Sequence, residues 1–199
     1  MVRRRERGNR TLSTMFILCE GEVTEPNYFR MFRMDGTTLS VNPGRRSHDR
    51  NDVVGLREWA EDIMGHPQFR KGRDRVWIVS DKDENSQPRL NEVRRWCQAN
   101  DVGFAYSNPC FEYWLLLHFK YDISCQNKED LYGDLAGCIG HTYRKNADYS
   151  RALVDRIPVA MRNARTLRKG LGPESYCDHN PFTSVDVLVD EILRSGCSI

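Results

Sequence analysis

Residues 15–25 read MFILCEGEVTE, in which an apolar run leads directly into an acidic cluster. Residues 76–85, VWIVSDKDEN, follow the same order. Each apolar run is typical of a buried β-strand, and carboxylates at the end of such a strand repel one another and lose solvation unless a cation neutralises them. The two segments therefore indicate a bound divalent metal ion, with polar turns after the strands as the structural alternative.

The first 120 residues alternate between strand and helix patterns. The pattern predicts strands at 14–19, 39–41, 75–80 and 102–106, and helices starting at Thr24-Pro26, covering 53–63 and 88–99, and starting at Asn108-Pro109. This alternation predicts an α/β fold with a mostly parallel sheet flanked by helices. Sites in such folds form at the carboxyl ends of the strands, so we expect both acidic clusters at one edge of the sheet.

A chain of 199 residues supports one core domain with a small appendage. We expect a basic tail at 1–13, an α/β core at 14–120 and a helical appendage at 121–199 that packs on the core. Residues 3–10 hold five Arg against one Glu, and residues 141–170 hold eight Lys or Arg against two Asp. Basic ends around an acidic middle suit a polyanion brought to a metal site.

No apolar run is long enough to cross a membrane, and the Arg-rich start is not followed by the apolar core of a signal peptide. We therefore expect a cytoplasmic protein without membrane contact. Seven cysteines without a Cys-x-x-Cys pattern fit reduced thiols better than a disulfide framework. A zinc site formed by Cys138, His141, Cys177 and His179 stays open as an alternative.

Asp81 and Asp83 are the first candidate metal ligands. They are two residues apart, so both carboxylates share a face if the strand stays extended. Mg²⁺ or Mn²⁺ is the cofactor that suits such hard oxygen donors. Glu20 ends the other strand, and Gly21 after it lets the backbone pass close to a ligand.

A third acidic candidate lies in the predicted helix that starts at Asn108 and Pro109. Glu112 is one turn inside this otherwise apolar helix, where a carboxylate is costly unless it is paired or bound to a metal. An ion pair with an arginine is an equally open explanation. His118, on the same helix, is expected to be a packing residue and not a catalyst.

Together these segments resemble the RloB-like family. The resemblance runs in order from about residue 14 to 192 and rests on residues 17–29, 81–83 and 107–119, with further agreement at 143–145 and 180–185. The family is regarded as a relative of the Toprim fold, the metal-binding module of topoisomerases, primases and OLD-type nucleases. The resemblance thus implies a Toprim- or Rossmann-like core, and a setting in bacterial anti-phage modules beside an ATPase of the ABC or AAA type.

By this resemblance, Glu20 would act as general acid or base or help to hold metal, and Asp81 and Asp83 would be the metal-holding pair. One position departs from the Toprim pattern, because Asn85 stands where many Toprim sequences carry a third aspartate. Its carbonyl can bind a hard cation but adds no charge. A second ion would need Glu25, Glu84 or Glu112.

The leading hypothesis is a Mg²⁺- or Mn²⁺-dependent phosphodiesterase, a nuclease that acts on DNA or RNA, including tRNA. Glu20 and Glu25 are the candidate acid–base residues, and Lys145 could lie against the scissile phosphate. The flanking backbone could be held by Arg162, Arg165, Arg168 and Lys169. A solvated helix face is the alternative explanation for this basic stretch.

Two other classes of function remain open. One is a non-catalytic module that binds nucleic acid or a partner ATPase and regulates a defence system. The other is a metal enzyme for a small nucleotide, which would need no extended basic surface. Trp59 and Trp96 could serve either the core or the interface of a homo-oligomer.

Overall fold

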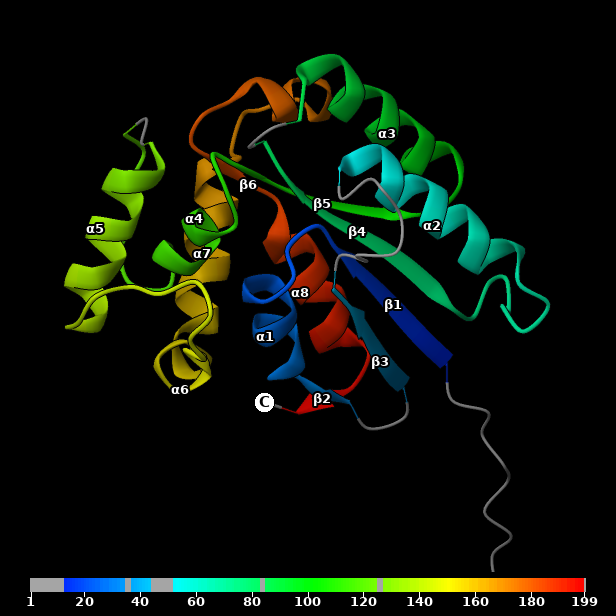
Figure 1. The fold of residues 1–199 in the computed structure, drawn as a ribbon, viewed down its shortest axis with the longest axis horizontal. Coiled ribbons are helices and arrows are strands. Elements are labelled where there is room, and N and C mark those ends of the chain that lie inside the picture. Colours follow the sequence, from blue (N-terminus) through cyan, green and yellow to red (C-terminus); the bar gives the residue numbers. More distant parts are fainter. Residues whose placement is uncertain (1–12, 35–36, 44–51, 83–84, 125–126, 199) are drawn as a thin grey trace, which may run out of the picture.

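The computed structural model describes residues 13–34, 37–43, 52–82, 85–124 and 127–198 (Figure 1). The predicted basic tail, apart from Ser13, lies outside these residues, as do the candidate ligand Asp83 and its neighbour Glu84. Five strands form one sheet in the order β3-β1-β4-β5-β6. The strands are β1 (Ser13–Cys19), β3 (Thr37–Asn42), β4 (Arg75–Asp81), β5 (Gly103–Asn108) and β6 (Phe182–Thr183). The first four are parallel, and β6 alone runs antiparallel, so the predicted α/β class is confirmed.

The register of the sheet brings the carboxyl ends of β1, β4 and β5 to one edge. Cys19 pairs with Val79, and Asp81 pairs with Ser107. The pairing extends past the end of β1, because the Glu20 amide donates to the Val79 carbonyl at 3.0 Å. Glu20, the first residue after β1, therefore lies beside the last residues of β4. The two acidic clusters thus meet at one edge of the sheet, as predicted.

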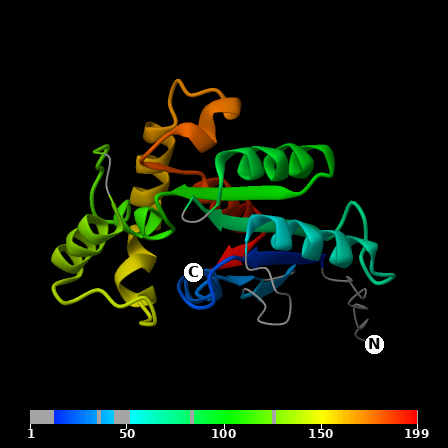
Figure 2. The same cartoon turned by 45° about the horizontal axis from the view of Figure 1, so that its top comes forward.

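Helices cover both faces of the sheet (Figures 1 and 2). One face carries α1 (Thr24–Arg30), α4 (Glu112–Leu116), α7 (Ile157–Leu167) and α8 (Val185–Arg194), and the other carries α2 (Val53–Gly65) and α3 (Gln87–Ala99). Helix α5 (Lys128–Ile139) packs on the outer side of α4, away from the strands. The shorter elements are β2 (Arg33–Met34), α6 (Ser150–Leu153), η1 (Val154–Arg156), η2 (Pro173–Asp178) and β7 (Cys197–Ser198), with β2 paired to β7. Both faces of the sheet are thus buried, which explains why β1 and β4 are apolar without interruption.

Alternation along the strands divides the core into two clusters. Ile17 and Val79 belong to the cluster under α1, α4 and α8, whereas Leu18 and Ile78 belong to the cluster under α2 and α3. Trp59 and Trp96 are partly buried and pack against the second cluster. Of the two uses predicted for these tryptophans, packing is the one that the structure shows.

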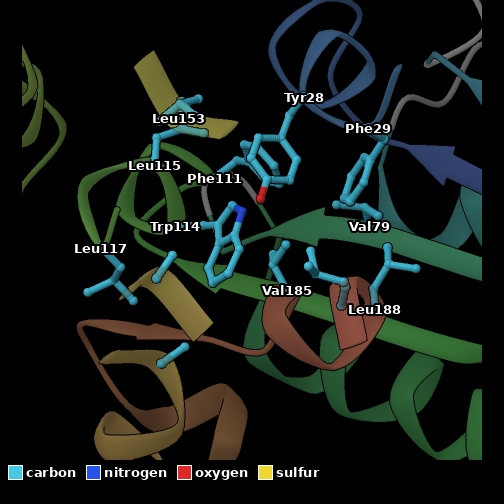
Figure 3. Close-up of a cluster of buried hydrophobic side chains, with 14 of the residues drawn as sticks. Tyr28, Phe29, Val79, Phe111, Trp114, Leu115, Leu117, Leu153, Val185 and Leu188 are labelled. Atoms are coloured by element: carbon cyan, nitrogen blue, oxygen red, sulfur yellow. The ribbon is translucent and has the colours of Figure 1, made fainter. Parts of the chain in front are cut away.

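The first cluster is rich in aromatic side chains (Figure 3). The Tyr28 ring meets Phe111 and Trp114 edge-on, with centroids 5.6 and 6.0 Å apart. Its hydroxyl lies 3.2 Å from Nε2 of buried His118, and His118 Nδ1 lies 3.0 Å from the Trp114 carbonyl oxygen. His118 is therefore a packing residue, as expected, and its burial lowers its pKa to about 4.

The expected division at residue 120 needs a correction. Residues after 120 do form helices, but β6 pairs with β5, and α8 packs against the sheet within the first cluster. The chain thus returns to complete the core, because the apolar side of α8 covers a face that the first 120 residues leave exposed. No helix in the described ranges has the length and apolar character needed to cross a membrane.

Candidate active site

A cavity of about 300 Å³ lies at the carboxyl edge of the sheet, and five carboxylates line it. Glu20 follows β1, and Glu22 is exposed in the loop after it. Glu25 is in the first turn of α1, Asp81 ends β4 and Glu112 begins α4. Lys145, from the loop between α5 and α6, completes this lining, which we call the acidic cavity. The described candidates for acid–base and metal chemistry are therefore all brought together, although they are up to 125 residues apart in sequence.

The Glu20 carboxylate is held by three hydrogen-bond donors. Ser80 Oγ donates to Oε2 at 2.5 Å, the Asp81 amide donates to the same oxygen at 3.3 Å, and Asn85 Nδ2 lies 2.9 Å from Oε1. Donors of this kind favour the ionised carboxylate and fix its orientation. Glu20 thus enters the cavity in a fixed orientation.

Asn85 joins the site to the opposite layer of the molecule. Its Nδ2 donates to Glu20 and to the Asp81 carbonyl (2.9 Å), and its Oδ1 accepts from the Val53 amide (3.1 Å) in the first turn of α2. The side chain is 3% exposed. The amide oxygen that was expected to offer a neutral cation ligand is therefore engaged with α2, and Asn85 acts as a positioning residue.

Asp81 is the least satisfied carboxylate of the acidic cavity. Its Oδ1 is buried and accepts no hydrogen bond from any residue that the structure describes. Burial raises the pKa of Asp81 well above its usual range, and the charges of Glu25, Glu20 and Glu112 raise it further. An ionised Asp81 thus needs a cation beside it.

Glu25 is packed against the loop that follows β1. Its Oε1 accepts from the Gly21 amide at 3.1 Å, and a Cβ at residue 21 would lie 2.0 Å from Glu25 Oε2. Any side chain at residue 21 would therefore displace the Glu25 carboxylate from its present position, in line with the close backbone passage expected there. Burial raises the pKa of Glu25 to about 7, with Glu112 as the main neighbouring charge that raises it.

Glu112 pairs with a tyrosine and a lysine, and not with the arginine of the alternative explanation. Tyr143 donates its hydroxyl to Glu112 Oε1 at 3.0 Å, and Lys145 Nζ lies 3.9 Å from the same oxygen. Partial burial lowers the pKa of Lys145, but Glu112 and Tyr132 raise it by more, so the ammonium group stays charged. Lys145 keeps 53% of its side chain exposed and can meet a ligand in the cavity.

The donor set of the acidic cavity suits a hard divalent cation. Five carboxyl groups line it against one ammonium group, and Asp81 Oδ1 has no hydrogen-bond donor among the residues that the structure describes. In the described part of the chain, no three acidic, histidine or cysteine side chains are yet arranged as a closed ligand group. The cavity therefore offers suitable oxygen ligands whose final arrangement would be set when a cation binds.

The zinc alternative has no support in the geometry. Cys138 is exposed on α5, whereas Cys177 is buried in the cluster under α2 and α3. The two cysteines belong to opposite layers, and no zinc-type group of three such side chains occurs among the described residues.

The basic stretch on α7 pairs mainly with α8. Arg165 lies 2.9 Å from Asp190, and Arg168 binds both carboxylate oxygens of Asp186 and the Thr183 carbonyl. The Arg168 side chain is only 11% exposed. Of the four residues predicted to hold a nucleic-acid backbone, Arg168 therefore has a structural role, and Arg162 and Lys169 are the exposed ones without an ion pair to a described residue.

The model of the family described as RloB-like protein matches residues 15–192. The chain belongs to the RloB-like family. The match runs from β1 to α8 and includes every carboxylate of the acidic cavity, so it covers the core of this chain and not one motif alone. Comparison with curated proteins and with solved structures gives no significant match.

Two groups that shape this RloB-like site were missed in the sequence. Ser80 orients Glu20, and Tyr143 donates to Glu112. Ser80 gives a weak local signal, because it is a polar residue inside an apolar strand. Tyr143 belongs to the segment 143–145 that agrees with the family, but nothing local indicates its contact with Glu112, which lies 31 residues away.

The pKa of Glu25 leads to a prediction about stability. The folded chain keeps a proton on Glu25 up to about pH 7, whereas the unfolded chain releases it near pH 4.5, so this group loses its stabilising contribution as the pH rises through that window. The effect is about 3 kcal/mol in the absence of metal. Mn²⁺ should restore the stability, and most strongly above pH 7.

Chemical unfolding of the wild type and of Glu25→Gln in chelator, across this pH range, measures the effect. The comparison is needed because His118, neutral in the folded chain, contributes in the opposite direction between about pH 4 and 6.5. His118 is common to both proteins, so its contribution cancels in the difference. A difference between the two proteins that stays constant with pH would contradict the prediction.

Proposed function

We propose that the chain is a divalent-metal-dependent phosphodiesterase that acts on nucleic acid. The observation that carries the proposal is the acidic cavity itself, where carboxylates from three segments of the chain face a charged lysine. One buried oxygen among them, Asp81 Oδ1, has no hydrogen-bond donor in the described part of the chain. The resemblance of RloB-like proteins to Toprim modules supports the same reaction class. It also supports a role in anti-phage defence beside an ABC- or AAA-type ATPase.

The residues of the cavity divide into three roles. Asp81, Glu25 and Glu112 would hold Mg²⁺ or Mn²⁺, with Glu20 beside them and Asp83 still a prediction outside the described residues. When bound, such an ion activates water and offsets charge on the reacting phosphate. Glu20, whose oxygens are fixed by Ser80 and Asn85, would accept or return a proton at Oε1.

Lys145 supplies the positive charge that an anionic substrate needs. Its Nζ is the cationic group of the acidic cavity, and the Thr24 hydroxyl fixes its backbone by donating to the Lys145 carbonyl at 3.0 Å. An ammonium group so placed would bind a non-bridging phosphate oxygen and hold the phosphodiester against the carboxylates.

A second candidate is a non-catalytic module that binds nucleic acid or an ATPase. It is favoured by the fact that the described carboxylates do not already form a closed metal-ligand group. Under this reading, the acidic cavity would bind a cation that supports structure, and no phosphodiester would be cut.

Incubation of the purified protein with labelled DNA, RNA and tRNA separates the two candidates. We expect one of these substrates to be cut in Mn²⁺ or Mg²⁺ and none to be cut in chelator. Binding of all three without cleavage in any metal would support the regulatory module. Calorimetry that detects no binding of Mn²⁺ would contradict both the enzyme and the cation site.

A further inference from the structure

A second cavity follows the acidic cavity along the same two walls. Its volume is about 420 Å³, and its lining includes Asn27 and Arg30 from α1 and Ser150 and Arg151 from α6. We call it the arginine cavity. Figures 1 and 2 show α6 beside α1, and the loop that leads into α6 carries Lys145 of the acidic cavity. One pair of chain segments therefore lines both cavities.

The arginines of this cavity are free to meet an anion. Arg30 and Arg151 are both exposed, and neither forms an ion pair with a residue in the described ranges. This distinguishes them from Arg165 and Arg168, which are paired with aspartates of α8. Two guanidinium groups that open on one cavity are typical of a phosphate-binding site, because each presents a fork of donors that matches phosphate oxygens.

The carboxylate that also lines the cavity, Asp148, has its own donors. Ser150 donates to Asp148 Oδ1 through its hydroxyl and, at 2.8 Å, through its amide. These bonds, with the nearby charge of Arg151, lower the pKa of Asp148 and keep it ionised. The lining described for this cavity thus carries two positive charges against one negative charge, an excess that favours an anion.

The spacing of the two cavities suits adjacent groups on a chain. Thr24 of the acidic cavity and Asn27 of the arginine cavity are three residues apart on α1, on the same side of the helix and about 4.5 Å apart along its axis. On the facing wall, the Arg144 amide donates to the Tyr149 hydroxyl at 2.7 Å, so the loop that connects Lys145 to Arg151 is closed on itself. An extended polyanion that contacts Lys145 would reach the two arginines next.

We propose that Arg30 and Arg151 form a subsite for a second phosphodiester, the one adjacent to the phosphate held in the acidic cavity. This rests on the proposed function, which places the reacting phosphate beside Lys145. The ligand is a nucleic-acid strand and not a single phosphate, because Arg30 and Arg151 lie on the same two walls as Lys145. The strand would run along the groove between α1 and α6.

The double variant Arg30→Ala/Arg151→Ala tests the subsite. Binding of a labelled single strand, as DNA and as RNA, is measured in chelator at several salt concentrations. We expect affinity to fall by about 10- to 100-fold at low salt. The slope of log K against log salt should fall by about 1.4, since each phosphate contact on a single strand contributes about 0.7.

Lys71→Ala/Arg95→Ala is the matched control. It also removes two positive charges from exposed side chains, but Lys71 lies at the amino end of the sheet and Arg95 on α3, on the other face. This control should bind as the wild type does. An equal loss in both variants would reduce the effect to net charge and overturn the subsite. The subsite for a strand would also be overturned if inorganic phosphate bound to the wild type as tightly as the strand does and bound poorly to Arg30→Ala/Arg151→Ala.

Kinetics in Mn²⁺ separate failure of the subsite from failure of the proposed function. We expect the double variant to show a KM raised by about tenfold or more with kcat little changed. Wild-type affinity and wild-type KM would show that the subsite is wrong while the phosphodiesterase stands. Weakened strand binding in a protein that cuts no substrate would leave the subsite in place and refute the phosphodiesterase.

Discussion

Asp81→Asn is expected to lower the rate of metal-dependent cleavage by about 1,000-fold or more. The substitution keeps the shape of the side chain but removes the charge and replaces one carboxylate oxygen by an NH2 group, which cannot bind a cation. Calorimetry should show that Mn²⁺ binding is lost together with cleavage. Thermal unfolding in chelator should show a variant at least as stable as the wild type, because burial and three neighbouring carboxylates oppose the Asp81 charge.

Loss of cleavage and of Mn²⁺ binding in a variant that keeps its stability distinguishes loss of the site from loss of the fold. Asp62→Asn is the matched control, since Asp62 is an exposed carboxylate on α2, on the other face of the sheet. It should retain cleavage and the stabilisation by Mn²⁺. If Asp81→Asn cuts nucleic acid at the wild-type rate, the assignment of the acidic cavity as the active site is wrong.

Asn85→Asp is expected to destabilise the metal-free protein by about 3 kcal/mol or more at neutral pH. The new carboxylate would replace the donor that lies 2.9 Å from both Glu20 Oε1 and the Asp81 carbonyl, so two hydrogen bonds become two repulsive contacts. The amino end of α2 would offset only about 0.3–1 kcal/mol of this cost, because one helix end attracts a carboxylate weakly. Repulsion therefore dominates.

Urea unfolding of three variants measures the separate contributions. Asn85→Ala loses the same hydrogen bonds without adding charge and should cost about 2 kcal/mol. Glu20→Gln/Asn85→Asp exchanges the amide and the carboxylate and should recover part of the loss. An Asn85→Asp protein of wild-type stability with tighter Mn²⁺ binding would show instead that this position is a cation ligand, as the third aspartate of many Toprim sequences suggests.

The sheet and the meeting of Glu20 with Asp81 could be predicted because both depend on local signals. An apolar run followed by carboxylates identifies a strand and its carboxyl end, and parallel strands share that edge. The convergence of Glu25, Glu112 and Lys145 was expected from chemistry and resemblance, and the structure places all three in one cavity. Asp83 remains a prediction.

Other parts of the structure depend on contacts that carry no local pattern. β6 has two residues, too few for a periodicity, so its return to the sheet could not be foreseen. The bond from Val53 to Asn85 joins residues 32 apart, and only the packed α2 reveals it. From the sequence, Arg168 was predicted to hold a nucleic-acid backbone, with a solvated helix face as the alternative. Its partner Asp186 lies on α8, 18 residues further along the chain, and only the structure reveals this ion pair.

Asn85 also has a mechanical consequence. Its Nδ2 donates to Glu20 at 2.9 Å, and its Oδ1 accepts from the first turn of α2 at 3.1 Å. Such bonds weaken steeply when stretched, so a shift of α2 by about 1 Å would release one of them. The position of α2 is therefore coupled to the orientation of the Glu20 carboxylate through Asn85. A ligand that displaces α2, on the opposite layer of the molecule, would change the orientation of Glu20 in the acidic cavity.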